Sequence, residues 1–431
     1  MNKAIYCCLI IAVSAFSALS QATDERRERP RVIVSDQMPK PAAKPSPAQA
    51  KPAVIISNTV PGAIQTPQPL PAEPRIEIPK PDPDFRDPVS GKTLSFRQIK
   101  SKIAEAKREL QTRPLSTAVS DPTTGTAEFV RIAYQDWKRN DIDFVVMSKD
   151  AFLDTKVDKE LISESGVRIK ARTIRGNGVN TPIVLISEDK ENHLPLMVQY
   201  PVIRNGKFIE MAYYMSTHPG LVTNEVVNAG RLYVRNVVEL AREKLKAKGI
   251  TIQPKIADIA ERLAAVEHVD HARFRNEEHK VIFNDIYTLY ALNEGQTYRY
   301  SVSSAGAGGM VQMIPSTYRM VQSWHPNVTM NADFVAGMQD HVNATQAMLL
   351  YMQRTWNDLI ANETVRNALA DNIATPEQLM AAGYNSNPAK LAGYIKRGNA
   401  GWTNLIPRET KIYLSIFESI DRQVPMAPRT R

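Results

Sequence analysis

The sequence predicts a multidomain protein in which a proline-rich linker precedes a small α+β domain and a mainly α C-terminal domain. Three observations predict this organisation. Prolines recur between residues 39 and 83 without steady periodicity, strand-like runs with a hairpin signal follow, and the pattern is helical almost to the end after Pro254. A chain of 431 residues with 43% hydrophobic residues is long enough for two or three packed cores.

The first 22 residues read as a signal peptide. Lys3 is followed by a mostly apolar run at residues 4–19 and then by the small-x-small pattern Ser20-Gln21-Ala22, which predicts cleavage after Ala22. An uncleaved anchor is the alternative, although the run is shorter than the ~20 residues of a spanning helix. Both cysteines, Cys7 and Cys8, lie in this segment. We therefore expect a periplasmic product without thiol chemistry or a further membrane span, tethered only if the peptide is retained.

Residues 23–87 are expected to form a linker rather than a core, because proline recurs there without an apolar period. One interpretation is plain disorder, and the other is a semi-rigid polyproline spacer of about 3 Å per residue. Residues 88–250 then predict the α+β domain. A charged helix at 97–110 precedes strand-like runs at 142–147, 182–187 and 194–203, and Asn205-Gly206 predicts a hairpin returning through 208–214. A helix at 223–248 closes this domain.

The helical domain spans residues 251–422, with a tail at 423–431, and contains the stretch that carries chemistry. Apolar residues at helical spacing between Ile282 and Tyr290 predict a helix that ends near Glu294. The small residues 303–309 can turn tightly and let a polymer lie close. The apolar segment 310–315 that follows has one strongly hydrogen-bonding side chain, Gln312.

These residues resemble the signature of the SLT-type lytic transglycosylases, relatives of goose-type lysozyme that cleave bacterial peptidoglycan. In that family a Glu is followed nine positions later by Ser, and then by a Gly-Ala-x-Gly turn, apolar pairs around a Gln, and Pro. The matching positions in this sequence are Glu294, Ser303, Gly306, Ala307, Gly309, Gln312 and Pro315. The family's Ser after the Glu is Gly295 here, and a frequent Pro is Ser304.

Three further blocks follow in the family's order. They are an Asp340-x-x-Asn343 helix start, the segment 382–388 with Tyr384-Asn385, in which Asn387 replaces a turn glycine, and the segment 409–414 with Tyr413. The resemblance implies a lysozyme-like fold for roughly residues 256–420 and a scaffold role for Asp340. It also implies that Tyr384 lies beside the acid and that substrate is bound by Ser303, Gly306, Met310, Gln312, Tyr384, Asn385 and Tyr413.

Glycosidic cleavage needs a proton donor for the leaving oxygen, and Glu294 is the candidate. A carboxylic acid donates at neutral pH only where apolar surroundings raise its pKa. We expect Tyr290, Met310, Val311 and Met313 to form such a wall. No Asp or Glu occurs between Glu294 and Asp333, which favours intramolecular attack over a second carboxylate. By the resemblance, Glu294 acts first as acid and then as base, the muramic acid 6-hydroxyl closes a 1,6-anhydro ring, and no cofactor is needed.

Two alternatives stay open, a hydrolysing muramidase and a catalytically silent cell-wall-binding scaffold. The net charge of +9 suits acidic envelope partners, whereas its spread along the chain without a basic helix argues against nucleic acid. We expect peptidoglycan glycan strands as substrate, and docking of the α+β domain to a secretion, conjugation or pilus apparatus. His268, His271 and His279 lack metalloprotease spacing, so we interpret them as surface histidines rather than metal ligands.

Overall fold

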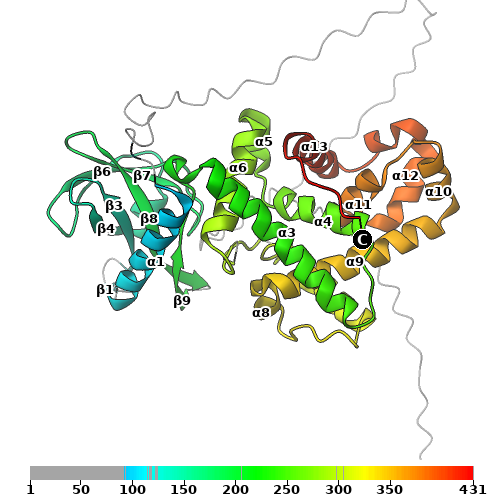
Figure 1. Cartoon of the computed structure of the whole chain (residues 1–431), viewed down its shortest axis with the longest axis horizontal. Helices are drawn as coiled ribbons and strands as arrows, with labels where there is room; N and C mark the ends of the chain where they lie inside the picture. The colour runs from blue at the N-terminus through cyan, green and yellow to red at the C-terminus, as the bar shows by residue number, and fades with distance from the viewer. Residues whose placement is uncertain are drawn as a thin grey trace, which may run out of the picture.

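The computed structural model describes residues 92–430, except for residues 93, 114, 116–118, 122–124, 205, 298 and 304. The expected signal peptide at 1–22 and the expected linker at 23–87 lie outside these residues. The described chain forms a curled antiparallel sheet region and a region of packed α-helices, with helix α3 running from the first along the second (Figure 1).

The main sheet has the strand order β4-β3-β8-β7-β6-β5, and β9 pairs with β8. All of its pairings are antiparallel. The Glu164 N–H, just after β5, donates to the Phe144 carbonyl of β4 at 2.9 Å, so the curl brings the two ends of the order together. The strands are β3 (Phe129–Asp136), β4 (Asp141–Ser148), β5 (Lys159–Ile162), β6 (Arg168–Thr173), β7 (Ile183–Ser187), β8 (Asn192–Arg204) and β9 (Lys207–Tyr214), beside a separate pair β1 (Val119–Asp121) and β2 (Gly125–Ala127).

Helix starts follow from capping chemistry in several places. Ser95 and Gln98 form a reciprocal capping box at the start of α1, and Thr375 and Gln378 form another at α11. The helices are α1 (Phe96–Thr112), α2 (Lys149–Leu153), α3 (Asn224–Lys246), α4 (Pro254–Val266), α5 (His271–Asn276), α6 (His279–Leu292), α7 (Pro315–Trp324), α8 (Phe334–Gln339), α9 (His341–Ala361), α10 (Glu363–Ala370), α11 (Pro376–Asn385), α12 (Leu391–Gly398) and α13 (Arg408–Gln423), with short 3-10 turns η2 (Pro219–Leu221), η3 (Pro388–Lys390) and η4 (Asn399–Asn404).

Helix α3 packs closely on α6. Val234 and Val238 of α3 share the largest hydrophobic core with Phe283 and Tyr287 of α6 and with residues of α4, α9, α11 and α13. The backbones approach most closely at Gly230, where an added Cβ would lie 1.9 Å from the Tyr287 carbonyl oxygen. The sequence pattern predicts α3 as the closing helix of the α+β domain. In the structure, much of its apolar face packs instead in the core of the helical region.

A separate core joins α1 to the end of α6. Ile99 and Leu110 of α1 are fully buried in a cluster that also contains Ala291 and Leu292 of α6 and Val226 of α3. This packing places the exposed side of α1 next to the turn that follows α6. None of the helices in the described part of the chain is long and apolar enough to cross a bilayer.

Candidate functional site

Glu294 lies in the turn directly after α6, where its side chain is 47% exposed. Its Oε2 accepts a hydrogen bond and ion pair at 2.8 Å from the Nζ of Lys100, a residue of α1 that is 44% exposed. The two residues are 194 positions apart, so local sequence patterns do not predict this pair. The carboxylate therefore faces solvent at the junction of the sheet region and the helices.

The residues on both sides of Glu294 are hydrogen-bonded to other segments. The Asn293 amide donates to the Met215 carbonyl at 2.6 Å and accepts from the Met215 N–H at 2.7 Å. The Gly295 N–H donates to Tyr233 Oη of α3 at 2.9 Å. Gly295 has φ +71°, a left-handed conformation that suits glycine better than the serine found there in the resembling family.

Tyr233 links this turn to α9. Its hydroxyl accepts from Gly295 and therefore donates its own proton to His341 Nδ1 at 2.6 Å. Burial lowers the pKa of His341 to about 4, which keeps the imidazole neutral as this acceptor. Burial also raises the pKa of Tyr233, with the Glu294 and Asp340 charges acting in the same direction. Sequence reasoning missed both Lys100 and Tyr233, because only the tertiary fold brings them to Glu294.

The glycine-rich segment folds as a compact loop. Gly308 bridges to Val302 and to Met313, and the Ser303 hydroxyl accepts from the Ala307 N–H at 3.0 Å. Gly309 has φ +68°, and an added Cβ would lie 2.5 Å from the Met338 carbonyl oxygen. This position therefore requires glycine on two counts. The tight turn is confirmed, and the segment that lies close to Gly309 is the protein's own α8; the approach of a polymer stays a prediction.

The polar side chains of the loop are engaged within it. The Gln312 amide donates to the Gly309 carbonyl at 2.9 Å and lies 3.4 Å from the Ser301 carbonyl, and its backbone has φ +46°. Gly306 sits half-buried near the loop's tip, with φ +75°, against the ring of Pro315. Ser303 and Gln312 thus stabilise the loop, and their role toward sugar stays a prediction.

The other expected substrate-binding residues form a framework behind the loop. Met310 is fully buried, and Tyr384 donates to the Val311 carbonyl at 2.6 Å rather than making the expected contact with the Glu294 carboxylate. Asn385 is 6% exposed and accepts from the Thr410 hydroxyl at 2.8 Å. Tyr413 is 1% exposed and donates to the buried Glu267 carboxylate at 2.6 Å.

The expected apolar wall around Glu294 is wrong in this structure. Its four proposed members are all at most 3% exposed and belong to the helical core, whereas the carboxylate is half-exposed; they are Tyr290, Met310, Val311 and Met313. The physical reason is that these side chains are buried in the helical core, where α6 and the loop pack on α4 and α9. The turn after α6 then directs Glu294 away from that core.

The three histidines interpreted from the sequence as surface residues are partly buried. His268 Nε2 donates to the Met310 carbonyl at 3.1 Å, and burial lowers the pKa of this histidine to about 3. His279 bonds Ser419 and the Phe274 carbonyl and stacks on the Phe274 ring at 3.9 Å. His271 is half-buried. Over the residues that the structure describes, no group of three or more His, Cys, Asp or Glu side chains is arranged to hold a metal ion.

Buried neutral histidines predict an acid-sensitive fold. Burial lowers the pKa of His218 and of His341 to about 4, below the usual 6.5, so the unfolded chain binds more protons below pH 6.5. Their stability contribution is complete above pH 6.5 and is lost as pH falls towards 4. At about 1.4 kcal/mol per pKa unit, we expect the free energy of unfolding to fall by several kcal/mol between pH 7 and pH 5. Urea titrations at both pH values measure this.

The control for that prediction is His218→Asn. His218 Nδ1 accepts from the Gly220 N–H at 3.1 Å, and an asparagine oxygen can accept that bond without titrating. The variant should lose less stability than the parent over the same pH interval. An unchanged pH dependence would show that His218 does not titrate in this range.

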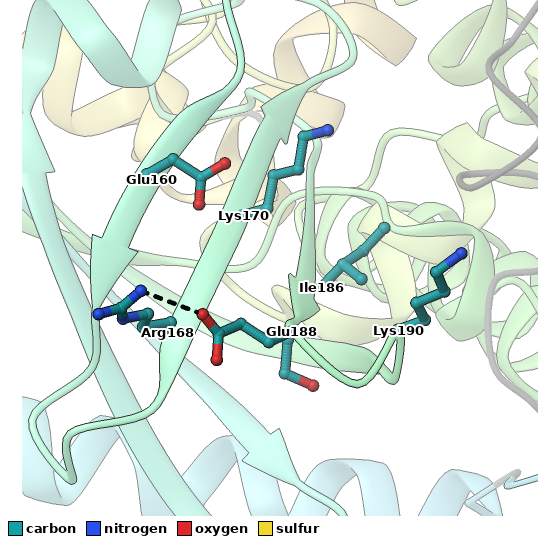
Figure 2. Close-up of a pocket in the computed structure, with 7 residues that line it drawn as sticks. Glu160, Arg168, Lys170, Ile186, Glu188 and Lys190 are labelled. Carbon is teal, nitrogen blue, oxygen red and sulfur yellow. Dashed lines mark hydrogen bonds and ion pairs between the residues drawn. The ribbon is translucent and has the colours of Figure 1, made fainter.

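A pocket of about 240 Å³ lies away from this site, on strands β5 to β7 (Figure 2). It is lined by Glu160, Arg168, Lys170, Ile186, Ser187, Glu188 and Lys190. Figure 2 shows Arg168 reaching Glu188, a pair separated by 3.3 Å with both side chains 71% exposed. The lining thus carries charges of both signs, of which Arg168 and Glu188 pair with each other.

A second, smaller pocket of about 50 Å³ lies where the sheet region meets the helices. Arg175, Asn180 and Thr217 line it from one side, and Arg273 and Asp285 line it from the other. Arg273 pairs with Asp285 at 2.7 Å and with Glu277 at 2.7 Å, so its charge is already balanced. Neither pocket includes Glu294 among its lining residues. Comparison of the chain with protein-family models, with curated proteins and with solved structures gave no match.

Proposed function

We propose that this chain is an exported, periplasmic peptidoglycan lytic transglycosylase. In this proposal the helical region is a lysozyme-like domain, the sheet region is an accessory domain, and the substrate is the β-1,4 bond between N-acetylmuramic acid and N-acetylglucosamine. One observation carries the proposal most directly. Glu294, the acid of the family-like signature, is a solvent-accessible carboxylate in a turn whose backbone is fixed on both sides.

The geometry supports a positioned acid rather than a random surface glutamate. Asn293 and Gly295 are each held by a hydrogen bond of 2.9 Å or less to another segment. The loop 301–315 is connected to the same place, because Tyr233 contacts His341 at the start of α9 and Gly309 packs against Met338 just before it. A group fixed in this way loses little entropy when it meets a substrate.

In the proposed reaction Glu294 donates a proton to the glycosidic oxygen as the bond to the anomeric carbon breaks. The substrate's N-acetyl group assists that departure, and the 6-hydroxyl of muramic acid then attacks the anomeric carbon. Glu294, now a carboxylate, takes the hydroxyl proton, so the enzyme returns to its initial state. One residue serves both steps. Asp340, another charge near Tyr233, caps α9 through the Val342 and Asn343 N–H groups and is thereby already engaged.

A specific observation also favours the second candidate, a catalytically silent cell-wall-binding scaffold. Glu294 is half-exposed and paired with Lys100, whereas a general acid usually lies in a drier setting. In that case the net charge of +9 and the sheet region would provide binding to acidic wall polymers or to envelope-spanning machinery. Hydrolysis to reducing ends, as by a muramidase, is the remaining alternative.

Mass spectrometry of digested sacculi tests the proposal. We expect the full-length exported protein to release muropeptides that end in 1,6-anhydro-muramic acid, one water lighter than the reducing products of a muramidase. Reducing ends would instead assign a hydrolase, and the absence of any released fragment would favour the scaffold. The Glu294→Gln protein, digested in parallel, distinguishes this activity from a contaminating one.

A further inference from the structure

Lys100 is anchored at its base and accessible at its tip. Its helix α1 is fixed by the Ser95–Gln98 capping box and by Ile99 and Ile103, which are at most 7% exposed. The ammonium group lies 5.7 Å from the centre of the Phe96 ring and 2.8 Å from the Glu294 carboxylate. The structure thus holds one cation at the candidate acid while leaving it open to solvent.

The titratable groups around Glu294 come from three helices. Lys100 belongs to α1, Tyr233 belongs to α3, and His341 and Asp340 lie at the start of α9. His341 is neutral, and Asp340 is used as a helix cap. Among the residues that the structure describes, Lys100 is therefore the cation that pairs with Glu294. Exposed ion pairs of this kind are weak, so another carboxylate can replace Glu294 as the partner of Lys100 at little cost.

We propose that Lys100 is a substrate-binding residue that recognises a carboxylate on the glycan and, by leaving Glu294, frees that acid to meet the glycosidic oxygen. This inference rests on the proposed function and names what the site selects, which is a glycan with acidic side groups next to the cleaved bond. Two sources share this chemistry. One is a carboxylate of the peptide stem, and the other is the lactyl carboxylate of strands from which the peptide has been removed.

Replacement of Glu294 by a substrate carboxylate as the partner of Lys100 explains how Glu294 can be ion-paired in the free protein and still act as the acid in the proposed reaction. In the free protein the ammonium group of Lys100 is paired with the Glu294 carboxylate at 2.8 Å. When the substrate carboxylate takes over the ammonium group, Glu294 is released to give its proton to the leaving oxygen. It regains a proton from the 6-hydroxyl, so turnover consumes none. A neutral glycan such as chitin offers no carboxylate and leaves Glu294 paired.

The test compares four glycan preparations: strands with peptide stems, strands stripped by an amidase, and each of these after conversion of its carboxyl groups to neutral amides. We expect the unmodified protein to cleave at least one acidic form with kcat/KM about tenfold above its neutral counterpart. Which acidic form shows the difference identifies the stem or the lactyl group as the source.

Lys100→Met, which keeps the length of the side chain but removes its charge, should cut the acidic form about tenfold less well and lose the discrimination. Lys100→Arg should retain the discrimination. Lys102→Met is the matched control, because Lys102 pairs with Glu105 on the same helix at 3.1 Å and should behave as the unmodified protein. Lys100 is exposed and Lys102 is partly exposed, so we expect both variants to fold, which a thermal melt checks.

Discrimination that persists in Lys100→Met, or its absence from the unmodified protein, would overturn the role of Lys100 while leaving the transglycosylase proposal in place. Failure of the unmodified protein to cleave any of the four preparations would overturn both. The two failures are therefore distinguished by whether the unmodified protein is active.

Discussion

Replacing Glu294 with glutamine is expected to reduce kcat/KM for glycan cleavage by at least about 10³-fold, because in the proposed reaction one residue performs both proton transfers. The amide has nearly the same shape as the acid, yet it neither donates the required proton nor accepts one. Removing the exposed pair with Lys100 should cost only about 0–1 kcal/mol of stability. Release of soluble muropeptides from sacculi measures the activity, and a thermal melt measures the fold.

Glu278→Gln is the matched control for this substitution. Glu278 precedes the first residue of α6, is exposed, and makes no side-chain capping bond to that helix. Its replacement should leave cleavage unchanged. Activity close to that of the unmodified protein in Glu294→Gln would end the assignment of Glu294 as the acid, and an inactive Glu278→Gln would point to a general effect on the fold.

Replacing Gly230 with alanine is expected to lower the free energy of unfolding by about 3 kcal/mol, through overpacking at the crossing of α3 and α6. The new Cβ would lie 1.9 Å from the Tyr287 carbonyl oxygen and 2.6 Å from its carbon. A backbone group cannot rotate away as a side chain can, so the helices must separate. Alanine's better helix propensity, worth about 1 kcal/mol, offsets only part of this loss. Urea unfolding followed by circular dichroism gives the value.

Gly393→Ala provides the comparison at a second helix glycine. There the added Cβ would meet only Arg397 Nη1, at 3.3 Å, and that flexible guanidinium can move. We expect this variant to be neutral or stabilised by up to about 1 kcal/mol. Equal stabilities of the two alanine variants would show that α3 and α6 are not in close contact at Gly230.

Local patterns were sufficient for much of the fold. The predicted runs at 142–147, 182–187, 194–203 and 208–214 are confirmed as parts of β4, β7, β8 and β9, and Gly206 has the left-handed φ of +72° that its hairpin requires. The helix that ends before Glu294 is confirmed as α6, which ends at Leu292. These features depend on turn chemistry and on periodicity within a few residues, which a sequence displays directly.

The missed features depend on contacts distant in sequence. Strand β3 has five consecutive buried residues at its end, so it lacks the alternation of a half-exposed strand. The burial of His341 and its contact with Tyr233 follow from packing of α3 on α9. Likewise, Glu294 meets Lys100 only because a hydrophobic core seats α1 against the end of α6. Sequence periodicity predicts which face of a helix is buried, but it does not predict which other helix packs against that face.

Helix α3 carries one further consequence. It covers α6 with Val234 and Val238 and supplies Tyr233 to the turn, although it lies before residue 251, where the helical domain is predicted to begin. Truncating the chain at that boundary would expose the apolar face of α6 that α3 covers, and would remove the hydrogen bond from the Gly295 N–H to Tyr233. We therefore expect that the chain does not divide at residue 251 into two parts that fold independently. A fragment that keeps the fold around Glu294 must include α3, a helix that none of the sequence motifs contains.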